Sequence, residues 1–346
     1  MNKYKIKNKV IGNSVFIIAE IGINHDGSLS KCKKLIKYAK KSGANAVKVQ
    51  TFKPESLTLD VDNEFFGPKK SGLWKGLKPY DLFSDAALPY DWHSILKKTA
   101  NDLGLIFFST PFDKESVDFL EKLDVPMYKI ASLEINDLDL IKYVAKKNKP
   151  IILSGGVADL ADIQLAIEAI LGVNKNIDIS LLKCTSEYPA DFIDANLVTI
   201  KNMIDTFGVR VGVSDHTLGL TVPLISVAFG AKIIEKHFIL NKSQGGADAA
   251  FSMEPNEFTD MVSRVREAEL AIGQVKYSVT NDQKLKRRSL FFIENLSKDD
   301  IITHSNVKSI RPGNGIEPKH LDKIIGMKVT KNIKKGTPVS WQLIKN

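Results

Sequence analysis

The sequence predicts a closed (β/α)8 barrel, the TIM-barrel fold of the α/β class, followed by a small C-terminal domain. Eight short apolar runs each end in polar or charged residues, and they cover 15–21, 46–52, 105–110, 127–132, 150–155, 179–185, 209–215 and 232–239. Stretches of helical character separate them, among them 28–42, 114–123, 159–171 and 196–207. Eightfold alternation of strand and helix is the pattern of such barrels.

The composition of the runs supports this assignment. Most are rich in Val, Ile and Phe without strict alternation, as expected of strands that are covered on both faces. Gly or Gly-Ala pairs stand just before three of them, at 43–44, 103–104 and 230–231, where a helix has to end. The longest helical stretch, 255–273, is expected to close the barrel.

Two connections after predicted strands are too long for simple turns. Residues 52–89 include several aromatic side chains, and residues 241–255 include two consecutive glycines and Asp248. Loops of this length on the catalytic face of a barrel are usually lids or binding loops. We therefore expect both to shape a substrate pocket.

The pattern changes after the last long helix. We predict a barrel domain over 1–275, a polar and basic linker over 276–288, and a compact unit of short strands over 289–346 with turns at 311–315 and 334–338. A unit of roughly 60 residues is near the lower limit for independent folding, so it is expected to lean on a partner.

Composition and charge limit the function classes. With 43% hydrophobic residues the chain can bury a full core, and no uncharged apolar run is long enough to cross a bilayer, so we expect a cytoplasmic protein without membrane contact. The net charge of +9 lies in 276–346, which holds 15 Lys and Arg against 6 Asp and Glu. That region lacks the aromatic and recognition-helix patterns of nucleic-acid binding, so a basic cover over an anionic substrate fits better.

Two histidines end neighbouring predicted strands. His216 follows the seventh strand and His237 ends the eighth, and adjacent parallel strands lie about 4.8 Å apart. Each could be an ordinary hydrogen-bonded barrel residue, but two at the same level favour a shared divalent ion. Two imidazoles without thiolates suit Mn, Co, Fe or Mg better than a closed structural zinc.

Lysines and hydroxyls end several other predicted strands. They are Lys48, Lys129, Thr110, Ser132, Ser154 and Ser214. Ammonium groups and hydroxyl donors that converge from separate strands suit a phosphate dianion. The main alternative is a Schiff-base aldolase that uses Lys129 as its nucleophile and needs no metal.

Three carboxylates stand at the same predicted face. Glu20 ends the first strand, where it could pair with a barrel lysine or act as a general acid or base on a water molecule. Glu134 and Asp248 lie in loops after strands, at positions suited to binding substrate hydroxyl or amide groups. Taken singly, such loop carboxylates are more often simply solvated.

The ordered motifs of the chain resemble those of the sialic acid synthases, the phosphoenolpyruvate-dependent nonulosonic acid synthases. The matching segments are 19–27 (AEIGINHDG), 48–51 (KVQT), 108–112 (FSTPF), 128–132 (YKIAS), 183–186 (KCTS), 213–217 (VSDHT), 235–238 (EKHF) and 311–315 (RPGNG). The resemblance covers nearly the whole chain and implies that the C-terminal unit is an antifreeze-like (SAF) domain. Segments 56–59, 72–74, 89–93, 245–252 and 287–290 are most similar to the branch that makes pseudaminic acid.

This resemblance implies a reaction and a role for each site residue. Phosphoenolpyruvate would condense with an amino sugar and water, with Glu20, Lys129, His216 and His237 as catalytic residues. His216 and His237 would hold Mn(II), Co(II) or Mg(II). Phosphoenolpyruvate would be bound by Lys48, Thr110, Lys129, Ser132, Ser154 and Ser214. The sugar would be bound by Gln50, Glu134, Ser186, Tyr188 and Asp248, with Arg311 arriving from the other subunit of a homodimer.

Other interpretations stay open at this point. Residues 20–25 are nearer to the neuraminic and legionaminic acid synthases, so the sugars of those enzymes are alternative substrates. A Schiff-base aldolase remains possible in principle, although the two histidines argue against it. A non-enzymatic carbohydrate-binding protein would not need Lys48, Lys129 and both histidines inside one barrel.

Overall fold

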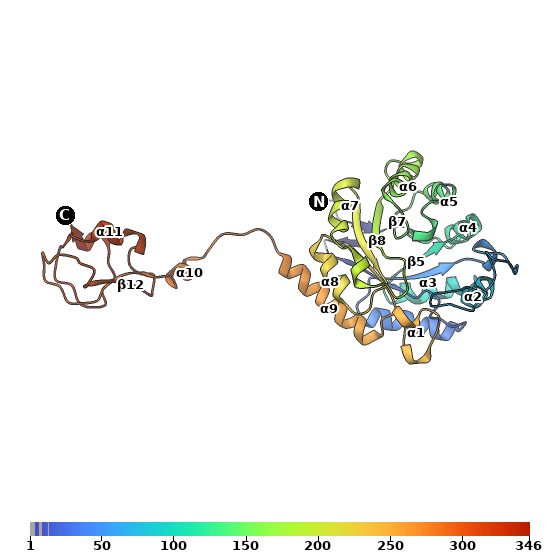
Figure 1. Ribbon diagram of the computed structural model, residues 1–346, viewed down its shortest axis with the longest axis horizontal. Helices are drawn as coiled ribbons and strands as arrows, with labels where there is room; N and C mark the ends of the chain where they lie inside the picture. The colour runs from blue at the N-terminus through green and yellow to red at the C-terminus, as the bar shows by residue number, and fades with distance from the viewer. Residues whose placement is uncertain (1–3, 7–8, 13) are drawn as a thin grey trace. The chain divides into compact units, whose positions relative to one another are not determined.

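The protein divides into two compact units. A computed structural model describes residues 4–6, 9–12 and 14–346 (Figure 1). The first unit is Met1–Gly273 and the second is Gln274–Asn346.

The first unit is the predicted barrel. Within the described residues, eight parallel strands close on themselves in chain order, so the predicted fold class is confirmed. The strands are β3 (Phe16–Glu20), β4 (Ala46–Thr51), β5 (Ile106–Pro111), β6 (Tyr128–Ile130), β7 (Ile151–Ser154), β8 (Ile179–Cys184), β9 (Arg210–Asp215) and β10 (Ile233–His237). Strand β10 pairs with both β9 and β3, with His237 opposite Glu20, which closes the ring.

The barrel interior has an apolar floor and a polar upper layer. The floor is one buried cluster that includes Phe16, Ile18, Phe108 and Ile152. Above it, the next inward-facing residues along the strands are polar: Glu20, Lys48, Thr110, Lys129, Ser154, Ser214 and Glu235. Gly212 lies in this crowded floor, because a Cβ there would collide with the backbone oxygen of Ile233. The tight floor leaves only the C-terminal face of the barrel open.

Helices cover the outside of the strands (Figure 1). They are α1 (Leu29–Lys41), α3 (Trp92–Asp102), α4 (Lys114–Lys122), α5 (Leu138–Ala145), α6 (Leu160–Val173), α7 (Thr199–Phe207), α8 (Thr221–Ala228) and α9 (Pro255–Ile272). A second buried cluster lies between them and the strands, with Leu35, Leu120 and Met261 among its members. Serine and aspartate caps start several helices, as Ser28 does for α1 and Asp113 for α4.

The first unit differs from the sequence prediction in three places. Residues 52–89 are not structureless, because a 3-10 turn (Pro54–Ser56) and helix α2 (Pro79–Ala86) form within them. Helix α7 begins at Thr199 rather than 196, since Asn196 has a φ of 42°, which interrupts the helical backbone. A short hairpin, β1 (Tyr4–Ile6) with β2 (Lys9–Gly12), precedes the barrel and was not predicted.

The second unit is built from short strands around its own core. These strands are β11 (Ser289–Phe292), β12 (Val307–Ile310), β13 (Lys328–Val329) and β14 (Ile344–Lys345). Short helices α10 (Asn281–Leu285) and α11 (Leu321–Ile324) accompany them. Helix α10 lies inside the segment predicted as linker, because Thr280 and Gln283 form a capping box there. Within the described residues, no helix combines the length and apolar character that crossing a bilayer requires.

Candidate active site

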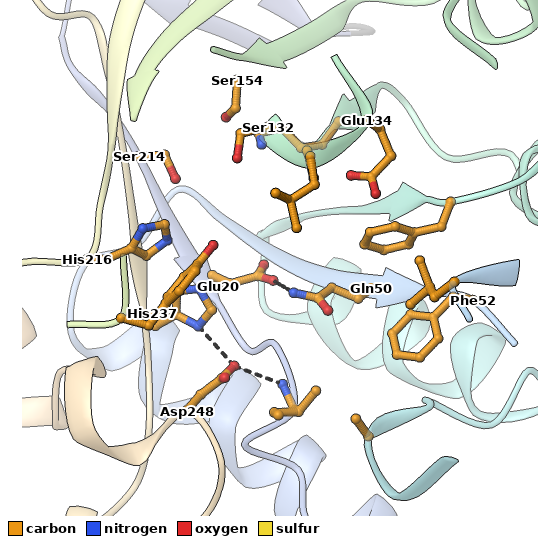
Figure 2. A pocket seen from close by; sticks show the side chains of 18 of the residues that line it. Glu20, Gln50, Phe52, Ser132, Glu134, Ser154, Ser214, His216, His237 and Asp248 are labelled. Atoms are coloured by element: carbon orange, nitrogen blue, oxygen red, sulfur yellow. Dashed lines mark hydrogen bonds and ion pairs between the residues drawn. The ribbon is translucent and has the colours of Figure 1, made fainter. Parts of the chain in front are cut away.

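The polar layer of the barrel opens into a pocket of about 230 Å³ at the C-terminal ends of the strands (Figure 2). Most of the residues singled out from the sequence line it: Glu20, Lys48, Gln50, Lys129, Ser132, Glu134, Ser154, Tyr188, Ser214, His216, His237 and Asp248. They converge because the last residues of parallel strands meet at one edge of the sheet.

Lys48 is held between two carboxylates. Its Nζ lies 2.9 Å from Glu20 Oε2 and 3.8 Å from Glu235 Oε1, and it donates a hydrogen bond of 3.3 Å to Thr110 Oγ1. Burial disfavours the ammonium, but the two carboxylates outweigh it and raise the pKa of Lys48. Gln50 donates to the other oxygen of Glu20 at 3.0 Å. Glu20 is therefore held by two side chains of the neighbouring strand β4.

At Lys129, unlike at Lys48, the effect of burial on the pKa is not fully compensated by neighbouring charges. Desolvation lowers its pKa, and the charge of Glu235, 3.7 Å away, only partly opposes this. Glu235 itself is buried, which disfavours its charge, yet Lys129 and Lys48 together hold its pKa at about 2. Ser214 donates a hydrogen bond of 3.0 Å to the same carboxylate. The centre of the site therefore consists of two lysines and two carboxylates, whose charges balance.

His216 and His237 lie side by side at the ends of β9 and β10, with ring centroids 5.3 Å apart. His216 Nδ1 lies 2.8 Å from the carbonyl oxygen of Thr185. His237 Nδ1 lies 3.2 Å from Asp248 Oδ2 but makes no hydrogen bond, although it is buried. Asp248 Oδ2 also accepts a hydrogen bond from the backbone of Ile23, which ties the loop after β10 to the loop after β3 (Figure 2).

The two imidazoles fit an open metal site rather than a closed one. Among the described residues, no group of three or more His, Cys, Asp or Glu side chains could hold a metal ion together. A pair of imidazoles, one of them with an unsatisfied ring nitrogen, could supply two ligands and leave the remaining positions to water and substrate. The geometry thus suits a catalytic ion and excludes, for the described residues, a structural zinc centre.

Hydroxyl groups line the wall formed by β6, β7 and β8. Ser132 Oγ lies 2.6 Å from Ser186 Oγ, whereas the buried Ser154 Oγ has no hydrogen-bond partner. Thr110 and Ser186 do not line the pocket themselves. Thr110 contacts Lys48, and Ser186 contacts Ser132. An unpartnered buried hydroxyl is uncommon in a folded protein, so Ser154 is available to an oxygen-rich ligand.

Four pocket residues with a polar group or a thiol in the side chain were not singled out as binding or catalytic residues from the sequence: Glu235, Cys184, Trp74 and Lys69. In the sequence, Glu235 and Cys184 stood out only as members of the matching segments 235–238 and 183–186. The structure brings His216 into hydrogen-bonding contact with Cys184, because β8 and β9 are adjacent. Trp74 and Lys69 come from the long segment after β4, where no periodicity indicated their position.

Trp74 joins three parts of the chain over the pocket. Its ring nitrogen donates a hydrogen bond of 3.2 Å to the backbone oxygen of Ala247, and its ring lies 5.8 Å from that of Tyr188. The Nζ of Lys69 lies over the indole of Trp74, 4.8 Å from the ring centroid. Arg311, which was expected to reach the sugar from another subunit, follows β12 in the second unit, where its side chain is exposed.

The sequence profile of the NeuB family matches residues 35–277, and that of the SAF domain matches residues 287–345. The chain belongs to the NeuB family. It is 44% identical to the pseudaminic acid synthase of Campylobacter jejuni over 93% of this chain and 94% of that protein. It is 37% identical to the N,N'-diacetyllegionaminic acid synthase of Legionella pneumophila over 98% of this chain and 97% of that protein.

A solved structure of this family supports the same conclusion. The N-acetylneuraminic acid synthetase from Leptospira borgpetersenii, in complex with citrate, superposes with a TM-score of 0.72 at 32% identity, covering 82% of this chain and 94% of that one. NeuB-family relatives of this chain are named synthases, so the chain is an enzyme, and the predicted family and SAF domain are confirmed.

Proposed function

We propose that the protein is a pseudaminic acid synthase. It condenses phosphoenolpyruvate with 2,4-diacetamido-2,4,6-trideoxy-altrose and water, and it releases pseudaminic acid and phosphate. The observation that carries this proposal is the 44% identity to the Campylobacter jejuni pseudaminic acid synthase over 93% of the chain, against 37% for the Legionella pneumophila legionaminic acid enzyme. N-acetylneuraminate or legionaminate synthesis is the alternative within the family.

Phosphoenolpyruvate binds in the polar layer of the barrel. Lys48 and Lys129 neutralise its oxygens, and Ser154, Ser214 and Ser132 donate hydrogen bonds, with Thr110 positioning Lys48. The unpartnered hydroxyl of Ser154 supports this assignment. Because the lysines act by charge and none attacks phosphorus, they stabilise the phosphate as it leaves with its bridging oxygen.

The chemical steps balance without an oxidant or reductant. The methylene carbon of phosphoenolpyruvate attacks the sugar aldehyde, a C–C bond forms, and the cation left at the enol carbon is captured by water. The resulting adduct loses phosphate by cleavage of the C–O bond, which leaves the 2-oxo acid. Glu20, paired with Lys48, takes the proton of the water or returns one to the aldehyde oxygen.

His216 and His237 hold a divalent ion, Mn(II), Co(II) or Mg(II). The ion supplies Lewis-acid activation of the aldehyde. The charges of the pocket support its presence: three lysines (Lys48, Lys69 and Lys129) face four carboxyl groups (Glu20, Glu134, Glu235 and Asp248), so the lining has no positive excess. An anionic substrate needs additional positive charge in such a site. Full activity after exhaustive chelation would contradict this assignment.

A second candidate, the Schiff-base aldolase, has one observation in its favour. Burial lowers the pKa of Lys129, which is what an amine nucleophile requires. Borohydride reduction in the presence of phosphoenolpyruvate or pyruvate distinguishes the two. A covalent adduct on Lys129 would establish the aldolase, and an unmodified, active enzyme would exclude it.

Phosphate release from phosphoenolpyruvate tests the main proposal. The protein is assayed with the altro-configured diacetamido sugar, with its manno-configured counterpart and with N-acetylmannosamine. We expect the highest kcat/KM with the altro sugar and no 18O in the phosphate when the reaction runs in 18O-labelled water. A higher kcat/KM with either manno sugar would overturn the specificity, and labelled phosphate would overturn the C–O cleavage.

We also propose a cytoplasmic homodimer in which the SAF domain of one subunit covers the site of the other. The second unit carries the whole net charge of +9, and Arg311 is exposed in the turn after β12, free to bind a substrate. Mixing Arg311→Ala chains with Glu20→Gln chains tests the arrangement. Recovered activity is expected after subunit exchange, and no recovery after confirmed exchange would contradict it.

A further inference from the structure

The active-site pocket has two chemically different ends. Figure 2 shows His216, His237 and the serines on one side and Phe52 on the other, with Glu20 and Gln50 between them. Around Phe52 the lining is mostly apolar, and Glu134 lies on the same side of the pocket. The residues of this end, which we call the apolar chamber, are Phe52, Leu57, Leu82, Phe83, Phe112 and Leu133. None of them takes part in the chemistry described above.

Three phenylalanines form the wall of the apolar chamber. The buried Phe52 at the end of β4 meets Phe83 and Phe112 edge to face, with ring centroids 6.1 and 5.4 Å apart. Phe83 and Leu82 belong to helix α2, which exists only because the segment after β4 is long enough to fold back over the mouth of the barrel. The chamber is therefore a product of that segment rather than of the barrel itself.

Helix α2 is fastened in this position by polar contacts on its outer side. Tyr80 donates a hydrogen bond of 2.6 Å to Glu55, and Lys78 lies 2.7 Å from Asp60. These contacts join both ends of the segment. The aromatic wall is thus held from outside, while its inner surface faces the pocket and has no polar groups to offer a ligand.

An apolar wall selects against hydroxyl groups. A hydroxyl placed against these rings would lose its hydrogen bonds to water, whereas a methyl group would gain contact area. The acceptor of the proposed reaction has three methyl groups, two on its acetamido substituents and one at C6, and a hydroxyl-rich hexosamine has fewer. The chamber therefore matches the methyl groups of the acceptor.

We propose that the apolar chamber binds one methyl-bearing substituent of the sugar, an N-acyl methyl or the C6 methyl, and that its depth limits the length of that substituent. The inference rests on the proposed function, because it assigns a subsite to the same acceptor. The N2-acyl, N4-acyl and C6 positions share the methyl chemistry, and the experiment separates them.

The probes are four sugars that differ by one group. They are the diacetamido-trideoxy sugar, its N2-propanoyl and N4-propanoyl analogues, and its 6-hydroxy analogue. For each protein, kcat/KM is expressed as a ratio to the value with the parent sugar, so that general damage to the site cancels. One methylene or hydroxyl in an apolar pocket changes such ratios by about tenfold or more.

The test variant is Phe83→Ala, which deepens the chamber. In the wild-type protein we expect one of the three analogues to be disfavoured by about tenfold, and in Phe83→Ala the ratio for that analogue rises by about tenfold. The analogue that responds identifies the substituent. Phe65→Ala is the matched control, because Phe65 lies in the same segment, is 77% exposed and does not line the pocket.

A second variant guards against misfolding of the first. Leu133 is 64% exposed, so Leu133→Ser places a hydroxyl on the chamber wall without disturbing the core. The kcat/KM ratio of Leu133→Ser for the 6-hydroxy or acyl analogue should change in the same direction as that of Phe83→Ala. If the kcat/KM ratios of both variants stay within twofold of the wild-type ratios, the apolar chamber does not bind a methyl-bearing substituent of the sugar. Wild-type protein that releases no phosphate with any of the four sugars would instead overturn the proposed function.

Discussion

Two clusters of buried charge lie back to back in the same strands of the barrel. Asp215 and Lys236 point outward from β9 and β10, while their neighbours Ser214 and Glu235 point into the pocket. Both clusters are almost completely shielded from solvent. They differ in how their polar atoms are satisfied, and that difference separates a structural ion pair from a binding site.

The outward pair is closed. Lys236 Nζ lies 2.6 Å from Asp215 Oδ2 and also donates to the carbonyl oxygen of Thr217, and Asp215 Oδ1 accepts two hydrogen bonds from Thr217. The pocket cluster is open, because Glu235 Oε2 and Ser154 Oγ are buried without hydrogen bonds. Buried polar atoms normally find partners within the protein, so open ones mark the place where a ligand completes the network.

The largest effect on stability is expected from the closed pair. Lys236→Met leaves Asp215 buried without its cation, which typically costs about 3–5 kcal/mol of unfolding free energy. Denaturant unfolding followed by far-UV circular dichroism measures it. The matched control is Lys201→Met, which removes an exposed pair with Asp205 and should cost no more than about 0.5 kcal/mol.

Equal losses of unfolding free energy in Lys236→Met and Lys201→Met would contradict the view that the Asp215–Lys236 pair stabilises the barrel. Because Asp215 and Lys236 adjoin His216 and His237, activity per folded molecule should be compared with stability. A loss of activity that exceeds the loss of folded protein would show that the pair also positions the histidines.

The open cluster should respond in the opposite way. Lys129→Met removes a buried cation whose pKa is already lowered by burial, and Glu235 keeps Lys48 as a partner. We expect a change in unfolding free energy of no more than about 1 kcal/mol. Turnover should fall roughly 30- to 1,000-fold, as expected for the loss of about 2–4 kcal/mol of transition-state stabilisation, with a higher KM for phosphoenolpyruvate.

Phosphate release and denaturant unfolding of the same preparation check both halves of this expectation. Lys149→Met serves as the control, because Lys149 pairs with Glu121 and Asp124 on the outside of the barrel. A Lys129 variant that keeps its turnover, or that loses as much stability as Lys236→Met, would remove the distinction between the open and the closed cluster.

The sequence was sufficient to predict where the open cluster lies, because one geometric rule determines it. Parallel strands end at a common edge, so Glu20, Lys48 and Ser154, each the polar end of an apolar run, had to converge. The same rule could have found Cys184 beside His216, since it needs only the adjacency of β8 and β9. The contacts of Glu235 with Lys48, Lys129 and Ser214 were not predicted, because each strand end was considered by itself.

The apolar chamber and Trp74 could not be predicted in this way. Their positions depend on how the segment 52–89 folds back over the barrel, which is decided by contacts between residues distant in sequence. Trp74 meets Ala247 and Tyr188, neither of which is related to it by any periodic spacing. Pro79, at the first turn of α2, was the one local signal of a helix within the segment.

The smallest expected effect concerns Glu134, an open carboxyl at the edge of the same pocket, whose Oε2 is buried without a hydrogen bond. Burial raises the pKa of Glu134 from 4.5 to about 7, and the charge of Lys129 opposes this only partly. Between these two values the folded chain keeps a proton that the unfolded chain releases. The stability contributed by Glu134 is therefore lost as the pH rises from about 5 to about 7.

Glu134→Gln removes this titration while keeping the shape of the side chain. We expect the variant and the wild type to be equally stable near pH 5 and the variant to be more stable at pH 8, by on the order of 1–3 kcal/mol. Glu121→Gln is a control of opposite sign. Burial raises the pKa of Glu121, but Tyr128 and Lys149 outweigh it and lower the pKa overall, so that variant should lose stability at pH 8 and lose less at low pH. Parallel pH profiles for wild type and Glu134→Gln would mean that Glu134 is solvated like an ordinary surface carboxylate.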